Sequence, residues 1–426
     1  MLSPSFYFGK ISGGNLIEIR IEDILIVILG LFFIANFLIS KKEKVKKPPL
    51  FFPILLWLTI GLFSILINFI FNNLSFDRGF FYLLKELEFF FIYFYVFSKV
   101  RNINFPKFII SVFLFFVVLN LFFIFYQIIN NIKFGECGIA AISESGVFPT
   151  GAFFLIIFIF LFNIFLFYFL ASDKTAYKKI IFGLICLSLV IGIWGVNSRT
   201  NILGFIFSSF LTSIFLLIKK VKPETILISA LIFIILIIAF VFINYSEGNN
   251  IRIAGIENRI VSVRTFDKLL YNFEIGRWNF IKAYYEEIMG KNNLLFLFIG
   301  FGKGYVVEAH NQYLRNFIEV GILGSLIFFF FILSILKAGF RNFFRSKESF
   351  LTALWAGVLV STFTMIFMSF ATEVFIVVKP SEIYWFFLAF AFGIQYRKEE
   401  EWRTKNNHEN SACSDKPLHL DKEKSL

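Results

Sequence analysis

His310 is the side chain in this sequence that is best suited to acid–base chemistry. The chain has three histidines, and the other two, His408 and His419, stand in a polar C-terminal stretch beyond the last hydrophobic run. His310 instead ends the one long polar segment that interrupts an otherwise hydrophobic chain. An imidazole exchanges a proton near neutral pH, so this position suggests a general base. The alternative interpretation is a structural histidine at the start of a helix.

Two arginines stand in short polar motifs and could bind an anion. Arg199 lies in a Ser-Arg-Thr tripeptide between two hydrophobic runs with almost no loop, and Arg277 lies in a Gly-Arg-Trp tripeptide. A guanidinium grips phosphate through two parallel hydrogen bonds. As alternatives, Arg199 reaches out to lipid phosphates, and Arg277 is a surface residue beside an interfacial tryptophan.

A glycine-rich run, residues 300–304, contains Lys303 and precedes the histidine. Backbone N–H groups in such a loop can hold a phosphate. The run lacks the Lys-Ser/Thr ending of a nucleotide-binding P-loop and any adjoining βαβ pattern. A simple turn is therefore the alternative interpretation.

The residues after the histidine are expected to begin a helix. If residues 310–319 are helical, Tyr313 shares a face with the histidine, whereas Asn311 and Arg315 lie around from it. Arg315 and Glu319 have i,i+4 spacing, which favours a structural ion pair over a catalytic role. The residues that we expect to support the site are Asn311, Tyr313, Lys303 and Arg315.

Three charged residues interrupt the third hydrophobic run: Lys85, Glu86 and Glu88. Charged groups at that depth are costly unless they are paired or face a water-filled cavity. Pairing among the three is the simplest account.

These residue types fit the attack of a sugar hydroxyl on an anomeric carbon whose leaving group is a lipid diphosphate. That reaction needs a base near the hydroxyl and fixed positive charge for the departing diphosphate. His310, Arg199 and Arg277 supply both. The loops on their side of the membrane contain no Asp-x-Asp and no His/Asp cluster of ligand spacing, so we predict no metal. No other cofactor is expected for this reaction.

The composition indicates a helical membrane protein that crosses the bilayer many times. The chain has 426 residues, of which 58% are hydrophobic, and 67 are phenylalanine. This excludes a soluble globular domain. The net charge of +12 comes from lysines and arginines in short loops, so it indicates membrane orientation and no nucleic-acid partner. The three cysteines are too scattered to form a disulfide framework.

Hydrophobic runs of about 20 residues predict about eleven transmembrane helices. They lie near 22–40, 50–71, 80–98, 108–129, 151–171, 180–197, 201–218, 225–243, 313–336, 350–370 and 383–396. Every second loop is basic, which places those loops in the cytoplasm and the others outside. The first 21 or so residues are then outside, either as a short N-terminal segment that is tolerated there or as the connection from a missing upstream helix, which would be a twelfth. The connector-like residues 19–23 favour the upstream helix.

The predicted organisation of this all-α polytopic chain has four parts. Residues 1–243 hold helices 1–8, 244–312 form one large outer loop with the site, 313–396 hold helices 9–11, and 397–426 form a polar cytoplasmic tail. Apolar residues recur at helical spacing around 275–290, so the outer loop is expected to carry amphipathic helices on the membrane surface.

Several of these motifs together resemble the O-antigen ligase/polymerase family. They are Ser198-Arg199-Thr200, Gly276-Arg277-Trp278-Asn279 with Ala283, Gly300-Phe301-Gly302, His310-Asn311-Gln312-Tyr313-Leu314 and Glu319-Val320-Gly321-Ile322-Leu323-Gly324. The resemblance covers about residues 190–335. Their order, spacing and outer placement all agree with the family, although each motif is weak alone. The N-terminus departs from the pattern, since the family's first helix is not visible there.

The resemblance implies a glycosyltransferase of the GT-C type in the bacterial inner membrane, with its active site on the periplasmic face. The alternation of basic loops places its C-terminus in the cytoplasm. Such enzymes take a glycan from undecaprenyl diphosphate. Ligases pass it to a lipid A core sugar, and polymerases pass it to another lipid-linked glycan. By the same resemblance, His310 is catalytic, and Arg199 and Arg277 bind the diphosphate.

Two other classes of protein remain alternatives on the sequence alone. A flippase for lipid-linked oligosaccharide would also be a polytopic membrane protein, but few titratable residues lie in the central spans and no repeats are visible. A non-catalytic scaffold would tolerate changes at His310.

Overall fold

The computed structural model of the chain describes residues 5–10, 16–20, 48–71, 73–100, 199–219, 294–306, 311–375 and 378–414, with shorter pieces within 24–30, 108–122 and 156–164 and at 185, 282 and 286. These residues form helices and one short hairpin. In the hairpin, β1 (Ser5–Lys10) pairs antiparallel with β2 (Leu16–Arg20), with Ser5 opposite Arg20. The prediction of a mainly helical protein is confirmed for this part of the chain, but the sequence analysis does not predict the hairpin.

Within the described residues, three helices are long and apolar enough to cross a membrane: α2 (Phe51–Ile70), α13 (Gln312–Arg345) and α14 (Ser349–Met368). The other described helices are α3 (Phe76–Lys99), α7 (Arg199–Ile218), α12 (Leu294–Ile299) and α15 (Val378–Ser414). They coincide with predicted hydrophobic runs, apart from the short α12. The total of about eleven spans stays a prediction, because several of those runs lie outside the described residues.

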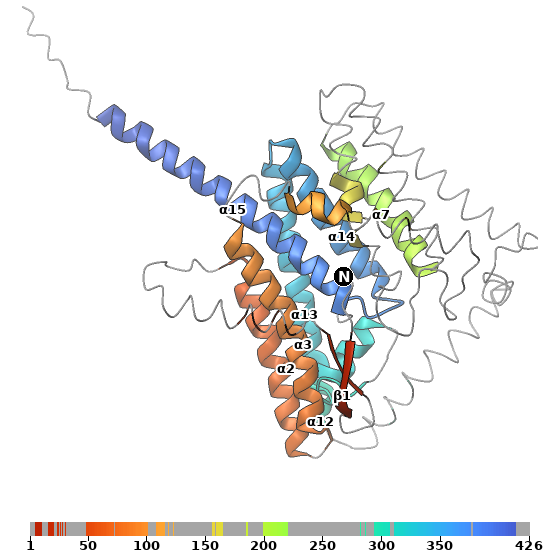
Figure 1. Cartoon of the computed structure of the whole chain (residues 1–426). Coiled ribbons are helices and arrows are strands. Elements are labelled where there is room, and N and C mark those ends of the chain that lie inside the picture. The colour runs from red at the N-terminus through yellow and green to blue at the C-terminus, as the bar shows by residue number, and fades with distance from the viewer. Residues whose placement is uncertain are drawn as a thin grey trace, which may run out of the picture.

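The helices pack as a bundle around α13 (Figure 1). α13 contacts both α2 and α14, α3 lies between α2 and α15, and α7 lies against α14. Fifteen of the 20 residues of α14 are buried, as expected for a helix that is apolar all round and sits inside a bundle. Aromatic rings fill the space between α3 and α15, where Trp385 lies 5.0 Å from Phe90 and 6.0 Å from Tyr93 between ring centroids.

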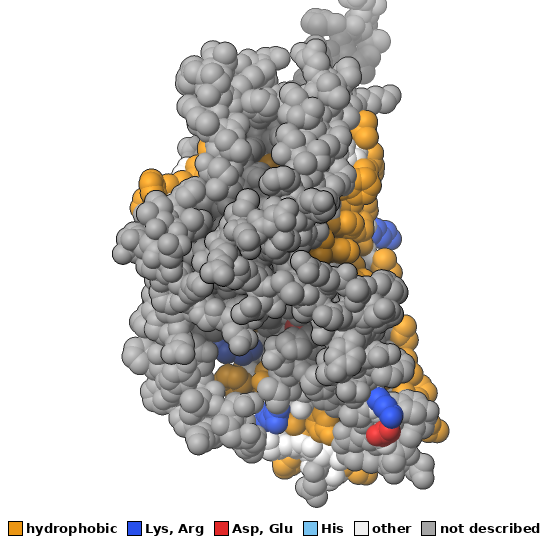
Figure 2. Space-filling model, turned by 90° about the vertical axis from the view of Figure 1, so that its right-hand side faces the viewer, with side chains coloured by type: hydrophobic (Ala, Val, Ile, Leu, Met, Phe, Trp, Pro, Cys, Tyr) orange, Lys and Arg blue, Asp and Glu red, His pale blue; other side chains and the backbone are white. Residues whose placement is uncertain are grey.

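Large hydrophobic side chains also cover the outside of the bundle. Phe52 is 60% exposed, Ile70 72% and Leu333 63%. Hydrophobic side chains dominate the described surface on the face in Figure 2, with few charges among them. Exposed apolar area on this scale is unfavourable in water and favourable in lipid, so these helices belong in a membrane.

Two helices extend beyond their predicted ends. α13 runs on to Arg345, so the basic residues Lys337 and Arg341 continue a helix and do not form a loop. α15 runs to residue 414 and protrudes from the bundle in Figure 1, so the first part of the predicted tail is helical. Hydrogen-bonded i,i+4 pairs, such as Arg397 with Glu401 at 2.7 Å, stabilise this polar extension.

Candidate functional site

The helix that follows the histidine is broken at Gly321. This residue has φ 66° and ψ −166°, so α13 consists of a short helix, 312–320, and a longer one from residue 322. A Cβ atom at Gly321 would lie 2.4 Å from the backbone carbonyl carbon of Phe298. The break is therefore built by close contact between two backbones, which only glycine allows at this φ.

The break frees backbone carbonyls that a continuous helix would use, and other segments satisfy them. The carbonyl of Ile318 accepts from the N–H of Phe301 at 2.8 Å, and the carbonyl of Glu319 accepts from the N–H of Gly302 at 2.9 Å. The Ser64 hydroxyl of α2 also lies 2.8 Å from the Glu319 carbonyl. Inside a membrane such freed groups must find partners in the protein, and here they do.

The glycine-rich run 300–304 supplies the N–H groups that bond to the carbonyls freed by this break. Gly300, Gly302 and Gly304 all have positive φ, at 78°, 96° and 78°. The N–H groups of residues 300, 301 and 302 donate to backbone carbonyls, and that of Gly304 donates to the Glu319 carboxylate at 3.0 Å. These N–H groups are used inside the protein, so the simple turn is the correct interpretation and a phosphate cradle from these four groups is not.

Lys303 points inward from this turn and is 1% exposed. Its Nζ lies 2.5 Å from Glu86 Oε1 of α3 and 3.9 Å from the ring centroid of Trp57 in α2. Trp57 Nε1 donates to Glu86 Oε2 at 2.9 Å. The predicted pairing of charges within α3 is thus correct for Lys85 with Glu88, at 3.4 Å, but wrong for Glu86, whose partner comes from the distant turn.

Arg315, in the short helix 312–320, lies between two carboxylates, one from the same helix and one from the segment after α14. Its Nε donates to Glu319 Oε1 at 3.0 Å, and its Nη1 is paired with Glu373, in the segment after α14. All three side chains are nearly fully buried, and the guanidinium also lies 5.5 Å from the ring of Tyr82. The predicted Arg315–Glu319 ion pair is confirmed. Because the Arg315 guanidinium is paired with two carboxylates of the protein, we interpret Arg315 as a structural residue and not as a substrate-binding one.

The first turn of α13 is fixed to the end of α14. Asn311 caps the helix, since its Oδ1 accepts from the N–H of Leu314 at 3.0 Å, and its Nδ2 donates to the carbonyl of Phe370 at 3.3 Å. The Gln312 N–H donates to the carbonyl of Ser369 at 2.9 Å. The Tyr313 hydroxyl donates to the carbonyl of Ile366 at 2.7 Å. These bonds hold the residues directly after His310 in one place.

The structure describes only part of the predicted site. His310 and Arg277 lie outside the described residues. Arg199 is the first residue of α7, and its side chain also lies outside them. The four predicted supporting residues, Asn311, Tyr313, Lys303 and Arg315, are described and are bound within the protein. Whether the three leading residues meet therefore stays a prediction.

Sequence reasoning missed several residues of this buried polar network. Glu373, Trp57 and Ser64 gave no local signal, because their partners lie in other segments of the chain. One signal was present: Gln312, Arg315 and the residues at 316 and 319 have i, i+3, i+4 and i+7 spacing, a polar stripe on one helix face. All four are buried.

Among the described residues, no group of three or more His, Cys, Asp or Glu side chains is arranged to hold a metal ion. The carboxylates of the network are instead paired with Lys303 and Arg315. No model of a known protein family matches the chain, and no curated protein matches it either.

Proposed function

We propose that the protein is a glycosyltransferase of the O-antigen ligase/polymerase type. The observation that carries the proposal is the structure around the resembling motifs: the glycine turn 300–304 and the broken helix 312–324 pack against each other through backbone hydrogen bonds. Motifs that are weak one by one thus belong to one folded unit, whose two parts precede and follow His310 in the sequence. Broken helices in membrane proteins are tolerated where they are buried or line a cavity, and they often mark binding sites.

In the proposed reaction, His310 takes the proton from a sugar hydroxyl of the acceptor. The hydroxyl oxygen then forms a bond with the anomeric carbon of the donor glycan, and the bond between that carbon and the diphosphate oxygen breaks. The electron pair leaves with undecaprenyl diphosphate, whose charge Arg199 and Arg277 offset. The acceptor is a lipid A core sugar in a ligase, or a second lipid-linked glycan in a polymerase for O-antigen or exopolysaccharide repeat units.

The proposal places the protein in the bacterial inner membrane, with the site on the periplasmic face and the C-terminus in the cytoplasm. The apolar described helices support a membrane location, and the alternation of basic loops supports the orientation. A flippase for the same lipid-linked oligosaccharide is the alternative from another class.

The decisive experiment uses purified protein in detergent with an undecaprenyl-diphosphate-linked glycan and a core-sugar or lipid-linked acceptor. We expect wild-type protein to form product without a sealed membrane, which a flippase does not do. His310→Ala should lose transfer, whereas the matched control His408→Ala, in the C-terminal stretch, should keep it. Equal transfer by both variants would refute the role of His310. Bare core with accumulated polymer in a deletion strain would indicate a ligase, and core with a single repeat a polymerase.

A further inference from the structure

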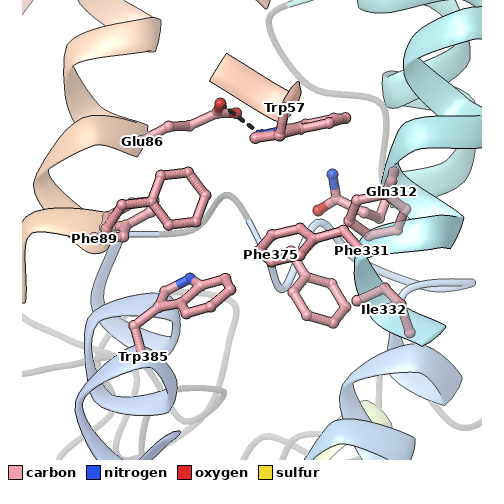
Figure 3. A pocket seen from close by; sticks show the side chains of 10 residues that line it. Trp57, Glu86, Phe89, Gln312, Phe331, Ile332, Phe375 and Trp385 are labelled. Atoms are coloured by element: carbon pink, nitrogen blue, oxygen red, sulfur yellow. Dashed lines mark hydrogen bonds between the residues drawn. The ribbon is translucent and has the colours of Figure 1, made fainter. Parts of the chain in front are cut away.

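A small cavity lies beside the Lys303–Glu86 pair, between α2, α3, α13 and α15. Its volume is ≈ 20 Å³. Aromatic rings form most of its wall, among them those of Trp57, Phe89, Phe331, Phe375 and Trp385. Two polar side chains also line it, the carboxylate of Glu86 and the amide of Gln312, and Figure 3 shows the Gln312 amide directed toward the surrounding aromatic rings.

Gln312 has an acceptor that is not used within the protein. The side chain is fully buried, and its Nε2 donates to Asn316 Oδ1 at 2.8 Å. Its Oε1 has no hydrogen-bond partner among the described contacts. Buried polar atoms nearly always have a partner, and one left without a partner is strongly unfavourable. The amide therefore points to a ligand that can donate a hydrogen bond.

Glu86 can accept from the same ligand. Oε1 accepts from Lys303, and Oε2 accepts from Trp57. A carboxylate oxygen accepts up to two hydrogen bonds, so each Glu86 oxygen keeps capacity for one more, and Glu86 lines the cavity. Because the Lys303 ammonium already balances the charge of Glu86, the ligand that fits is neutral. The volume of the cavity is sufficient for a water molecule.

We propose that this cavity binds one water molecule, which donates its two hydrogens to Gln312 Oε1 and to the Glu86 carboxylate. A cavity of this size can hold a water when polar groups line it, whereas a purely apolar cavity stays dry. The water joins α3 to the first turn of α13 and extends the chain of bonds from Lys303 through Glu86 to Gln312 and Asn316. The site rests only on these residues and is independent of any glycosyl transfer.

The test is a cryo-electron microscopy map of the full chain in lipid nanodiscs, at a resolution that shows ordered water. We expect one compact density within hydrogen-bond distance of both Gln312 and Glu86. An empty cavity, or an elongated density such as a lipid chain, would overturn the proposal.

A variant pair then tests the role assigned to Gln312. In Gln312→Leu the density should be lost, because one polar partner is not enough to hold a water. The control Asn342→Leu changes another buried amide with an unpartnered oxygen, at the far end of α13, and should keep the density. Density that persists in Gln312→Leu would overturn the assignment. If that variant does not fold, the wild-type map still decides.

Discussion

Glu373, in the segment after α14, is ion-paired with Arg315 in the second turn of α13, although 58 positions separate them along the chain. The same guanidinium is bonded to Glu319 one turn further along the helix. One arginine thus ties the short helix 312–320 both to itself and to the end of α14. The short helix before Gly321 is therefore fixed relative to α14 and does not hinge freely at the break, because Arg315 anchors it to the segment after α14.

Loss of the Glu373 charge should weaken this anchor. Glu373→Gln keeps the size of the side chain but replaces a charge-assisted hydrogen bond with a neutral one. We expect a loss of about 1.5 to 3 kcal/mol in the free energy of unfolding, seen as a lower melting temperature of the purified protein in detergent. The measurement can follow tryptophan fluorescence on heating.

The matched control is Glu348→Gln. Glu348 is paired with Lys398, but these side chains are 53% and 31% exposed. Exposed ion pairs contribute only about 0 to 1 kcal/mol, so this variant should melt close to the wild type. Equal losses in the two variants would contradict the special position of Glu373.

The Lys303–Glu86 pair should show strong coupling in a double-mutant cycle. Lys303→Met leaves a buried carboxylate without its cation, and breaking a buried ion pair in this way costs about 3 to 5 kcal/mol. Glu86→Gln likewise leaves a buried ammonium. The double variant removes both charges, so we expect it to be more stable than Lys303→Met alone. Additive losses in melting experiments would show that the two side chains do not depend on each other.

The sequence predicts the positions of most described helices but not the partners of their charges. Hydrophobic runs locate α2, α7 and α14 to within about two residues, because a bilayer demands about 20 apolar residues in succession. The Arg315–Glu319 pair is also predictable, since i,i+4 spacing is a local property. The pairing of Glu86 with Lys303 joins segments that are 217 positions apart, and no local pattern records it.

The glycine turn 300–304 also shows that contacts between distant segments cannot be predicted from local sequence patterns. Three glycines in five residues predict a turn, but the choice between a phosphate cradle and a structural turn depends on what the N–H groups meet. Here the N–H groups of Phe301 and Gly302 meet two carbonyls that are free because Gly321 breaks α13. Two glycine motifs about 20 positions apart are thus one feature, which becomes visible only when both backbones are placed together.

The hydroxyl of Tyr313 should matter for transfer because it fixes the first turn after His310. Tyr313→Phe removes the hydroxyl and with it the hydrogen bond to the Ile366 carbonyl, and one such bond is worth about 1 kcal/mol. On the proposed function, we expect a clear fall in the rate of glycan transfer, measured with purified protein and lipid-linked donor.

Tyr384→Phe serves as its control. The Tyr384 hydroxyl lies 2.8 Å from the Thr362 hydroxyl, so this contact joins α15 to α14, whereas that of Tyr313 joins α13 to α14. It should lose a similar amount of stability and keep its transfer rate. If both variants transfer equally well while His310→Ala does not, Tyr313 has no positioning role.

Gly321 should tolerate no side chain, even the smallest. In Gly321→Ala the added Cβ would stand 2.4 Å from the backbone of Phe298, at a φ that L-residues rarely adopt. Neither backbone can move without loss of the hydrogen bonds between residues 301–302 and 318–319, so we expect little folded protein in detergent, judged by size-exclusion chromatography. Gly357→Ala in α14 is the matched control, because its Cβ would meet a side-chain atom of Phe160 at 3.1 Å, where a ring can shift. A Gly321→Ala variant that elutes and melts like Gly357→Ala would show that the break at Gly321 does not hold the turn and the helix together.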